Sequence, residues 1–180
     1  MPSKPPRLQQ AVDFAGEARA LHALVSQMTG EQRLEPTGFK GWTSEDILIH
    51  LHFWNSAADF SVTQPEALAA IKNSISEAGS MRGVERESVV ERGEALVTAW
   101  IALVEDMERR WEDLDPKRRL PWVGPDMSAR SSMTARQMEH WAHGQAIYDL
   151  LGKERQDAAR LRNIVVLGIN TFGWTFIVRG

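Results

Sequence analysis

The 180-residue sequence contains no cysteine. This absence excludes disulfides, thiolate metal ligands and a cysteine nucleophile, so a metal site would have to use histidine, aspartate or glutamate. Lysine and arginine form no basic block, and the formal net charge is −3. We therefore expect no nucleic-acid partner. Length and composition are those of a globular protein, and we expect a single domain over residues 1–180.

The sequence also lacks an apolar run long enough to cross a bilayer, which takes about 20 residues. Its most apolar stretch, residues 164–178, is interrupted by Asn170, Thr171 and two glycines. We predict that this stretch is a buried helix rather than an interfacial or membrane helix, and we expect no membrane partner. The N-terminal "MPSKPPRLQQ" has no apolar signal-peptide core, so we expect a cytoplasmic protein.

Helical periodicity is the main pattern present, and no segment alternates strictly between apolar and polar residues. The predicted helices cover about residues 8–28, 43–62, 65–77, 87–113, 133–151 and 157–178. Two loops rich in glycine and proline separate them, at about 29–41 and 114–132. Four of these helices are long and amphipathic, which predicts an all-α fold: an antiparallel four-helix bundle with one or two short extra helices.

Helix ends are marked in two places. Thr43 is expected to be an N-cap with Asp46 at N3, a capping-box arrangement, and Trp42 and Ile47 fit a hydrophobic staple. Gly152 is a suitable C′ residue for the helix that ends near residue 151.

The stretch "MEHWAHG", residues 138–144, contains the first candidate metal ligands. Glu139 and His143 are four residues apart and share a helix face with Ala146, Ile147 and Leu150. We therefore predict that both polar side chains point into the bundle, whereas His140 points elsewhere. A buried glutamate is rare unless it is paired or bound to a metal.

A third ligand is expected on the helix over residues 43–62. Its predicted buried stripe contains Ile47, Leu51, Trp54, Ala57 and Ala58. His50 falls within that stripe, while His52 lies on a more mixed face. The inward set His50, Glu139 and His143 is then either a metal site or a hydrogen-bonded polar contact in the core, and spacing alone leaves both open. His52 and His140 are treated as non-ligands.

Three motifs carry a family resemblance, in the right order along residues 8–180. "GWTSEDILIHL" resembles the signature that opens the second helix of the DinB-like superfamily, and more closely the N-terminal domain of mycothiol-dependent maleylpyruvate isomerases. "ARQMEHWAHGQAIYDLLG" resembles that family's Arg-x-x-Glu-x-x-x-His segment. "LPWVGPDMSARSS" resembles the loop that precedes it in one branch.

The resemblance implies that His50, Glu139 and His143 hold a divalent metal. Zinc fits two histidines and one glutamate best, with nickel, manganese or iron also open. It further implies an enzyme, a thiol S-transferase or isomerase, in which a low-molecular-weight thiol acts on a small electrophilic substrate. The sequence departs from the family at Ala146, where members often have aspartate. Related chains are also often longer, with a smaller C-terminal domain.

Candidates beyond the ligands are Arg136, Trp122 and Arg130. Arg136 would orient Glu139 or bind an acidic substrate, with a surface i,i+3 salt bridge as the alternative. Trp122 and Arg130, from the preceding loop, would line or cover a pocket, with solvated loop residues as the alternative. Gly144 in mid-helix suggests close approach of a ligand or helix, or plain tolerance.

Two other functions compete with the enzyme. One is a non-catalytic helical binding module, either metal-binding or metal-free. The other is a metal hydrolase, for which the sequence offers no spare inward carboxylate to act as general base. Bundles with exposed apolar helices often dimerise, which keeps a homodimer open.

Overall fold

The computed structural model describes residues 7–179, with side chains up to residue 173. Within this range the protein is mostly helical, which confirms the all-α prediction. Its α-helices are α1 (Gln9–Val25), α2 (Gly30–Leu34), α3 (Ser44–Thr63), α4 (Pro65–Glu77), α5 (Met81–Ser88), α6 (Gly93–Trp111), α7 (Ala129–Leu150) and α8 (Arg162–Arg179). Strands β1 (Arg119–Leu120) and β2 (Met127–Ser128) pair as a small antiparallel hairpin, and a 3-10 helix covers Ala159–Leu161.

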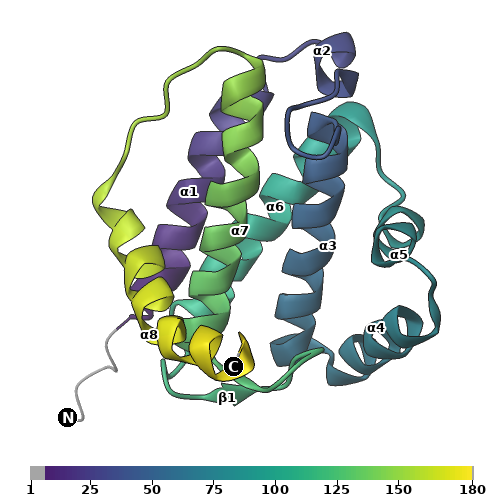
Figure 1. Ribbon diagram of the computed structural model, residues 1–180. Helices are drawn as coiled ribbons and strands as arrows, with labels where there is room; N and C mark the ends of the chain where they lie inside the picture. The colour runs from purple at the N-terminus through teal and green to yellow at the C-terminus, as the bar shows by residue number, and fades with distance from the viewer. Residues whose placement is uncertain (1–6, 180) are drawn as a thin grey trace.

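The core lies among α1, α3, α6 and α7 (Figure 1). Helix α1 packs against α6 and α7, and α3 packs against the same two helices from the other side. Large side chains from these helices are fully buried, among them Phe14, Leu51, Trp100 and Met107. Helices α4 and α5 pack along α3 on its outer side. The antiparallel four-helix bundle, as a topology, stays a prediction.

The start of α3 has the predicted capping box. The backbone N–H of Asp46 donates to Thr43 Oγ1, and the N–H of Thr43 donates to the Asp46 carboxylate, both at 3.1 Å. The same carboxylate pairs with Arg82 and Arg86 of α5, each at 2.5 Å. A local start signal thus also fixes a neighbouring helix against α3. At the end of α7, Gly152 has φ +61°, as expected for C′.

Several helix boundaries differ from the prediction. The predicted loop at 29–41 contains α2, which begins with its own capping box at Thr29. The predicted helix over 87–113 is interrupted: α5 ends at Ser88, and α6 begins at Gly93, where φ is +57°. Helix α7 begins at Ala129, earlier than expected, because the Ser128 side chain caps it. The loop before it holds the β1–β2 hairpin.

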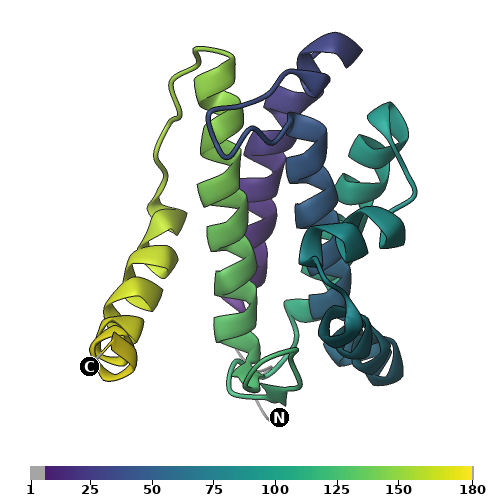
Figure 2. The ribbon, with the colours of Figure 1, turned by 45° about the vertical axis from the view of Figure 1, so that its right-hand side comes forward.

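The prediction that residues 164–178 form a buried helix is wrong for the residues whose side chains are described. Helix α8 packs along α7, outside the core, and leaves much of its surface uncovered (Figure 2). Val165, Val166, Ile169 and Phe172 are exposed, Ile169 by 68%. The core is already filled by the four long helices, so no buried place remains for a fifth. Among the described helices, none combines the length and apolarity that a bilayer span requires.

Candidate metal centre

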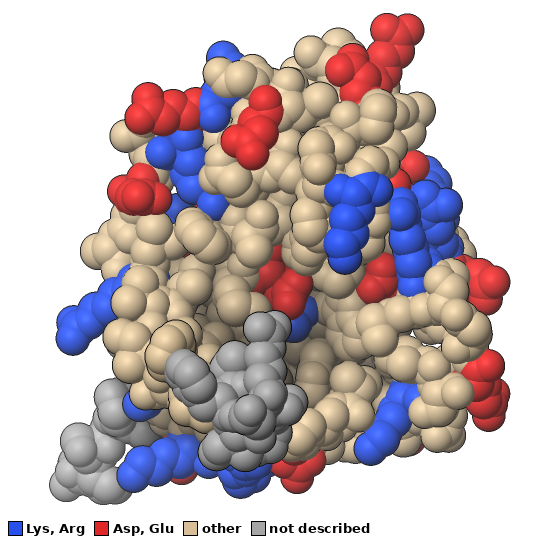
Figure 3. Space-filling model, in the orientation of Figure 1, with Lys and Arg blue, Asp and Glu red and all other residues tan. Residues whose placement is uncertain are grey.

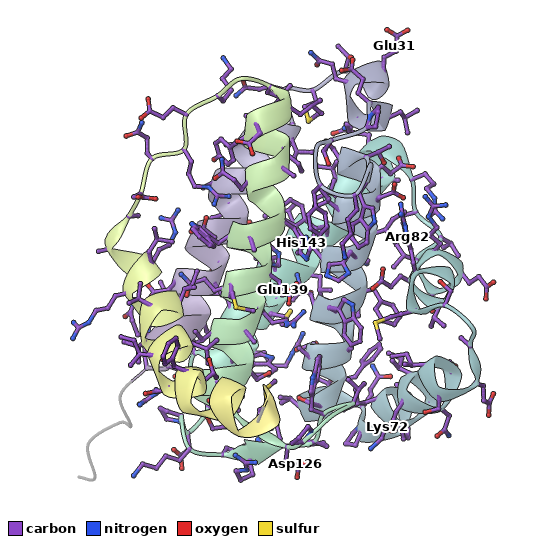
Figure 4. All side chains as sticks on the ribbon, in the orientation of Figure 1. Glu31, Lys72, Arg82, Asp126, Glu139 and His143 are labelled. Atoms are coloured by element: carbon purple, nitrogen blue, oxygen red, sulfur yellow. The ribbon has the colours of Figure 1, made fainter. Side chains whose placement is uncertain are left out.

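His50 of α3 and Glu139 and His143 of α7 meet across the gap between these two helices. One potential ligand atom from each lies within 4.8 Å of the others. Glu139 Oε2 is 3.3 Å from His50 Nε2 and 3.0 Å from His143 Nε2. Figure 4 shows Glu139 and His143 on the side of α7 that faces α3. The structure thus brings together the three residues that the sequence selected.

The cluster lies at the edge of the core rather than deep within it. The side chains of His50, His143 and Glu139 are 13%, 16% and 25% exposed. In Figure 3 the surface between α7 and α3 is hollowed, and acidic and basic side chains are visible in the hollow. The three candidate ligands are therefore reachable by a small molecule from solvent.

A cavity of about 260 Å³ opens beside the cluster. Its walls are mainly apolar, and the polar groups His50, Arg136 and Glu139 lie together in it. The lining residues are His50, Trp54, Met81, Trp122, Val123, Arg136 and Glu139. A concave apolar space with a few convergent polar groups is the usual form of a small-molecule site.

Glu85 of α5 is a functional candidate that sequence reasoning missed. It is only 3% exposed, and its Oε1 lies 2.9 Å from His50 Nδ1. Trp54 Nε1–H donates to the same oxygen at 2.8 Å. A carboxylate that accepts from Nδ1–H leaves Nε2 free to bind a metal and fixes the orientation of the ring.

Hydrogen bonds and nearby charges within the cluster shift the pKa values of Glu139 and His50. Burial would raise the pKa of Glu139, but hydrogen bonds from His143 and His50, together with the Arg136 guanidinium, hold it well below its usual range. Burial would lower the pKa of His50, yet its hydrogen bonds to Glu139 and Glu85 raise it overall. Glu139 is therefore ionised at neutral pH, the form that binds metal.

Two aromatic residues from the loop before α3 pack against His143. The Trp42 ring stacks on the imidazole with centroids 5.8 Å apart and an interplanar angle of 11°. Phe39 meets the same imidazole edge-on at 5.0 Å. From the sequence, Trp42 was expected only in a hydrophobic staple, because the residue pattern does not show how the loop before α3 folds.

Neither His140 nor His52 belongs to the cluster. His140 points away from the cluster, as expected, and is fully buried: Trp100 Nε1–H donates to its Nε2 at 3.2 Å, and its Nδ1 lies 2.7 Å from the Arg136 carbonyl oxygen. Burial lowers the pKa of His140 to about 3, so it is a neutral core residue. His52 is half-buried and lines a separate cavity with Phe53 and Phe60.

Of the other predicted site residues, Arg136 and Trp122 line the cavity beside the cluster. The Arg136 guanidinium carbon is 5.4 Å from the centroid of the Trp122 ring. The alternative of a surface salt bridge for Arg136 is wrong, because the residue is 6% exposed and forms no ion pair with Glu139. Arg130 is exposed in the first turn of α7 and lines a different cavity, with Thr134 and Asn163.

Two positions on α7 next to the ligands have structural explanations. A Cβ on Gly144 would lie 3.0 Å from Arg155 Nη2 and 3.4 Å from the Leu21 side chain of α1. Close approach of the Arg155 and Leu21 side chains, rather than of a ligand, accounts for this glycine. Ala146, where the family often has aspartate, lines a separate pocket with Phe39 and Asp149 rather than the cavity beside the ligands.

The donor set fits a divalent cation. Two imidazole nitrogens and one carboxylate oxygen are the ligands of several catalytic zinc sites, in which three protein ligands leave a further position open. The two His Nε2 atoms already converge on one Glu139 oxygen, so a cation would take the place of the protons that they share. Glu85 supplies the carboxylate that commonly orients a ligand histidine.

Comparison with known proteins agrees with this geometry. The family described as "Mycothiol maleylpyruvate isomerase N-terminal domain" matches residues 14–148. Two uncharacterized proteins of Mycobacterium tuberculosis, MT0041 of strain CDC 1551 / Oshkosh and Rv0036c of strain ATCC 25618 / H37Rv, are each 33% identical over 168 residues. The match covers 92% of this chain but only 65% of each relative. No solved structure matches the chain.

The family match over residues 14–148 includes all three residues of the cluster, and the chain therefore belongs to the mycothiol maleylpyruvate isomerase N-terminal domain family.

Proposed function

We propose that the protein is a metal-dependent enzyme that uses a low-molecular-weight thiol to act on a small electrophile, as a thiol S-transferase or isomerase. The observation that carries the proposal is the His50–Glu139–His143 cluster opening onto a cavity of small-molecule size. We take the metal to be zinc, from the ligand types. Within the proposal the chain is a single domain, cytoplasmic, and able to form a homodimer.

His50, Glu139 and His143 would hold the divalent ion, which would supply Lewis-acid chemistry and lower the pKa of a thiol that binds there. The protein's own residues supply the rest. Glu85 holds His50 in the tautomer and orientation that a ligand needs. Trp54 and Trp122 form apolar walls beside the candidate ligands, against which the carbon skeleton of a substrate would pack. With no cysteine in the chain, the thiol comes from outside.

A non-catalytic metal-binding module is the second candidate. The alanine at position 146 favours it, since the family often has an acidic residue there. The curated relatives are themselves uncharacterized and extend beyond this chain, so they do not decide between the two. A turnover assay distinguishes the enzyme from the module. The assay uses mycothiol and maleylpyruvate, the thiol and the substrate in the family's name. An enzyme would consume mycothiol or isomerise maleylpyruvate, whereas a module would do neither.

The proposal is tested by elemental analysis of purified protein. We expect about one divalent metal per chain, and loss of that metal in Glu139→Ala. Glu154→Ala, which changes an exposed glutamate outside the cluster, should retain it. Absence of bound metal in the unaltered protein, even after reconstitution with zinc, would overturn the proposal. Metal without turnover would favour the module.

A further inference from the structure

Arg136 is a buried cation whose hydrogen-bonding groups lack partners. The residue is 6% exposed, and its Nε and Nη1 have no hydrogen-bond acceptor in the described part of the chain. A buried charge is expensive unless it is paired, and a guanidinium has five N–H donors to satisfy. The face of Trp122 at 5.4 Å offers a cation–π contact but accepts no conventional hydrogen bond.

The carboxylate of Glu139 does not satisfy this arginine. Glu139 lowers the cost of burying the guanidinium through space, but no ion pair joins the two residues. Glu139 Oε2 is already shared by the His50 and His143 imidazoles. If Glu139 also binds a divalent cation, its single negative charge does not neutralise both that cation and the Arg136 guanidinium. This side of the cavity would then carry a net positive charge. That arrangement favours an anion from solvent.

We propose that Arg136 is the anchor for a carboxylate group of the substrate, so that the cavity takes small carboxylic acids with an apolar carbon skeleton. Arginine binds carboxylates in a bidentate fork, and Arg136 lines the same cavity as His50 and Glu139. Trp54, Trp122 and Val123 would pack on the carbon skeleton. The role of the neighbouring metal in this inference rests on the proposed function. The anion site at Arg136 does not.

The test uses trans-cinnamate as probe and cinnamamide, its neutral counterpart of similar shape. The zinc-loaded protein, as the whole 180-residue chain, is titrated with each compound, and Kd is measured by ligand-observed NMR. We expect cinnamate to bind at least about tenfold more tightly than cinnamamide. Arg136→Met, which keeps a long side chain without charge, should remove this preference. Arg136→Lys should keep part of it, because a point charge replaces the fork.

Controls separate the anchor from the metal and from folding. Arg118→Met removes an exposed arginine outside the cavity and should leave the preference unchanged. Zinc content and melting temperature are measured for each variant. Equal binding of the two compounds by the unaltered protein, or a preference that persists in folded, zinc-loaded Arg136→Met, would overturn the inference; the latter result would place the carboxylate on the metal. If the protein binds no metal but still prefers cinnamate through Arg136, the anchor stands and the proposed enzyme function fails.

Discussion

At the level of single residues, the candidate metal centre includes a supporting side chain, Glu85, that would not itself be a ligand. Glu85 lies behind His50, and its Oε1 accepts hydrogen bonds at 2.9 Å and 2.8 Å from the His50 and Trp54 rings. Without it, His50 could present either nitrogen to a metal and could rotate out of the cluster. An ordered second layer of this kind often matters to affinity almost as much as the ligands themselves.

Replacing this glutamate tests that role. We expect Glu85→Gln to weaken zinc binding by about 10- to 100-fold, because the neutral amide is a poorer acceptor for the His50 Nδ1–H. Affinity is measured by competition with a chromophoric chelator. Glu87→Gln, an exposed position two residues along α5, is the matched control and should bind zinc normally. An unchanged zinc affinity in Glu85→Gln would show that His50 needs no such support.

The sequence predicted the position of some residues of the candidate site but not of others, for a physical reason. His50 could be placed because α3 has one clear apolar stripe, and its members Ile47, Leu51 and Trp54 are indeed buried. Helix α7 is covered on several sides, by α1, α3 and α8, so periodicity could not rank its polar residues. His140 is accordingly more buried than His143, and Arg136 is buried rather than on the surface. Glu85 was missed because its role comes from contact between distant helices.

At the level of elements, Asp46 connects the start of α3 to α5. It caps its own helix and pairs with Arg82 and Arg86. Burial would raise the pKa of Asp46, but hydrogen bonds from these arginines and from the Thr43 backbone lower it to about 2. Because Glu85 lies on α5, this clamp also holds the residue that orients His50.

We expect Asp46→Asn to destabilise the protein by about 1–2 kcal/mol at pH 7, because the cap loses its charge and both ion pairs. The carboxylate stays ionised in the folded protein down to about pH 2, whereas in the unfolded chain it protonates near 3.8. Its stabilising contribution is therefore complete above about pH 4 and is lost as pH falls toward 2. Urea unfolding at several pH values measures this.

The stability gap between unaltered protein and Asp46→Asn should narrow over that pH range. Asp106→Asn, which breaks an exposed i,i+3 pair with Arg109, should change stability by less than about 0.5 kcal/mol. A gap of constant size from pH 6 to pH 2 would contradict the assigned role of the Asp46 charge.

Helix ends could be predicted where the residues that mark them are adjacent in the sequence. The capping box at Thr43 and the C′ glycine at residue 152 were identified from a few adjacent residues. Helix α5 was not, because it is short, contains Gly83 and has few apolar residues; it depends on the Asp46 ion pairs and on packing against α3. The part of α8 whose side chains are described is exposed but was predicted as buried, because an apolar sequence does not show whether a neighbour is available to cover it.

At the scale of the whole molecule, the proposed metal would add a connection between two long helices, α3 and α7, that also meet inside the core, where Asn55 Nδ2 lies 3.4 Å from His140 Nε2. His50 comes from α3, and Glu139 and His143 come from α7. Between these helices lies the cavity, so they are packed less closely here than α1 and α7 are on the far side. A cation held by both helices would stabilise the folded state selectively, because the unfolded chain does not bring its three ligands together.

Chelation should therefore lower the melting temperature. A metal present at 100 to 1,000 times its Kd adds about 2.7–4.1 kcal/mol to stability, which corresponds to roughly 5–15 °C for a chain of this size. We expect a drop of this order when EDTA is added to the unaltered protein and to Glu154→Ala, measured by circular dichroism. Glu139→Ala should melt at the same temperature with and without EDTA. If chelation leaves the unaltered protein's melting temperature unchanged while zinc is removed, the cluster does not join α3 to α7 energetically, and the metal would act only on what enters the cavity.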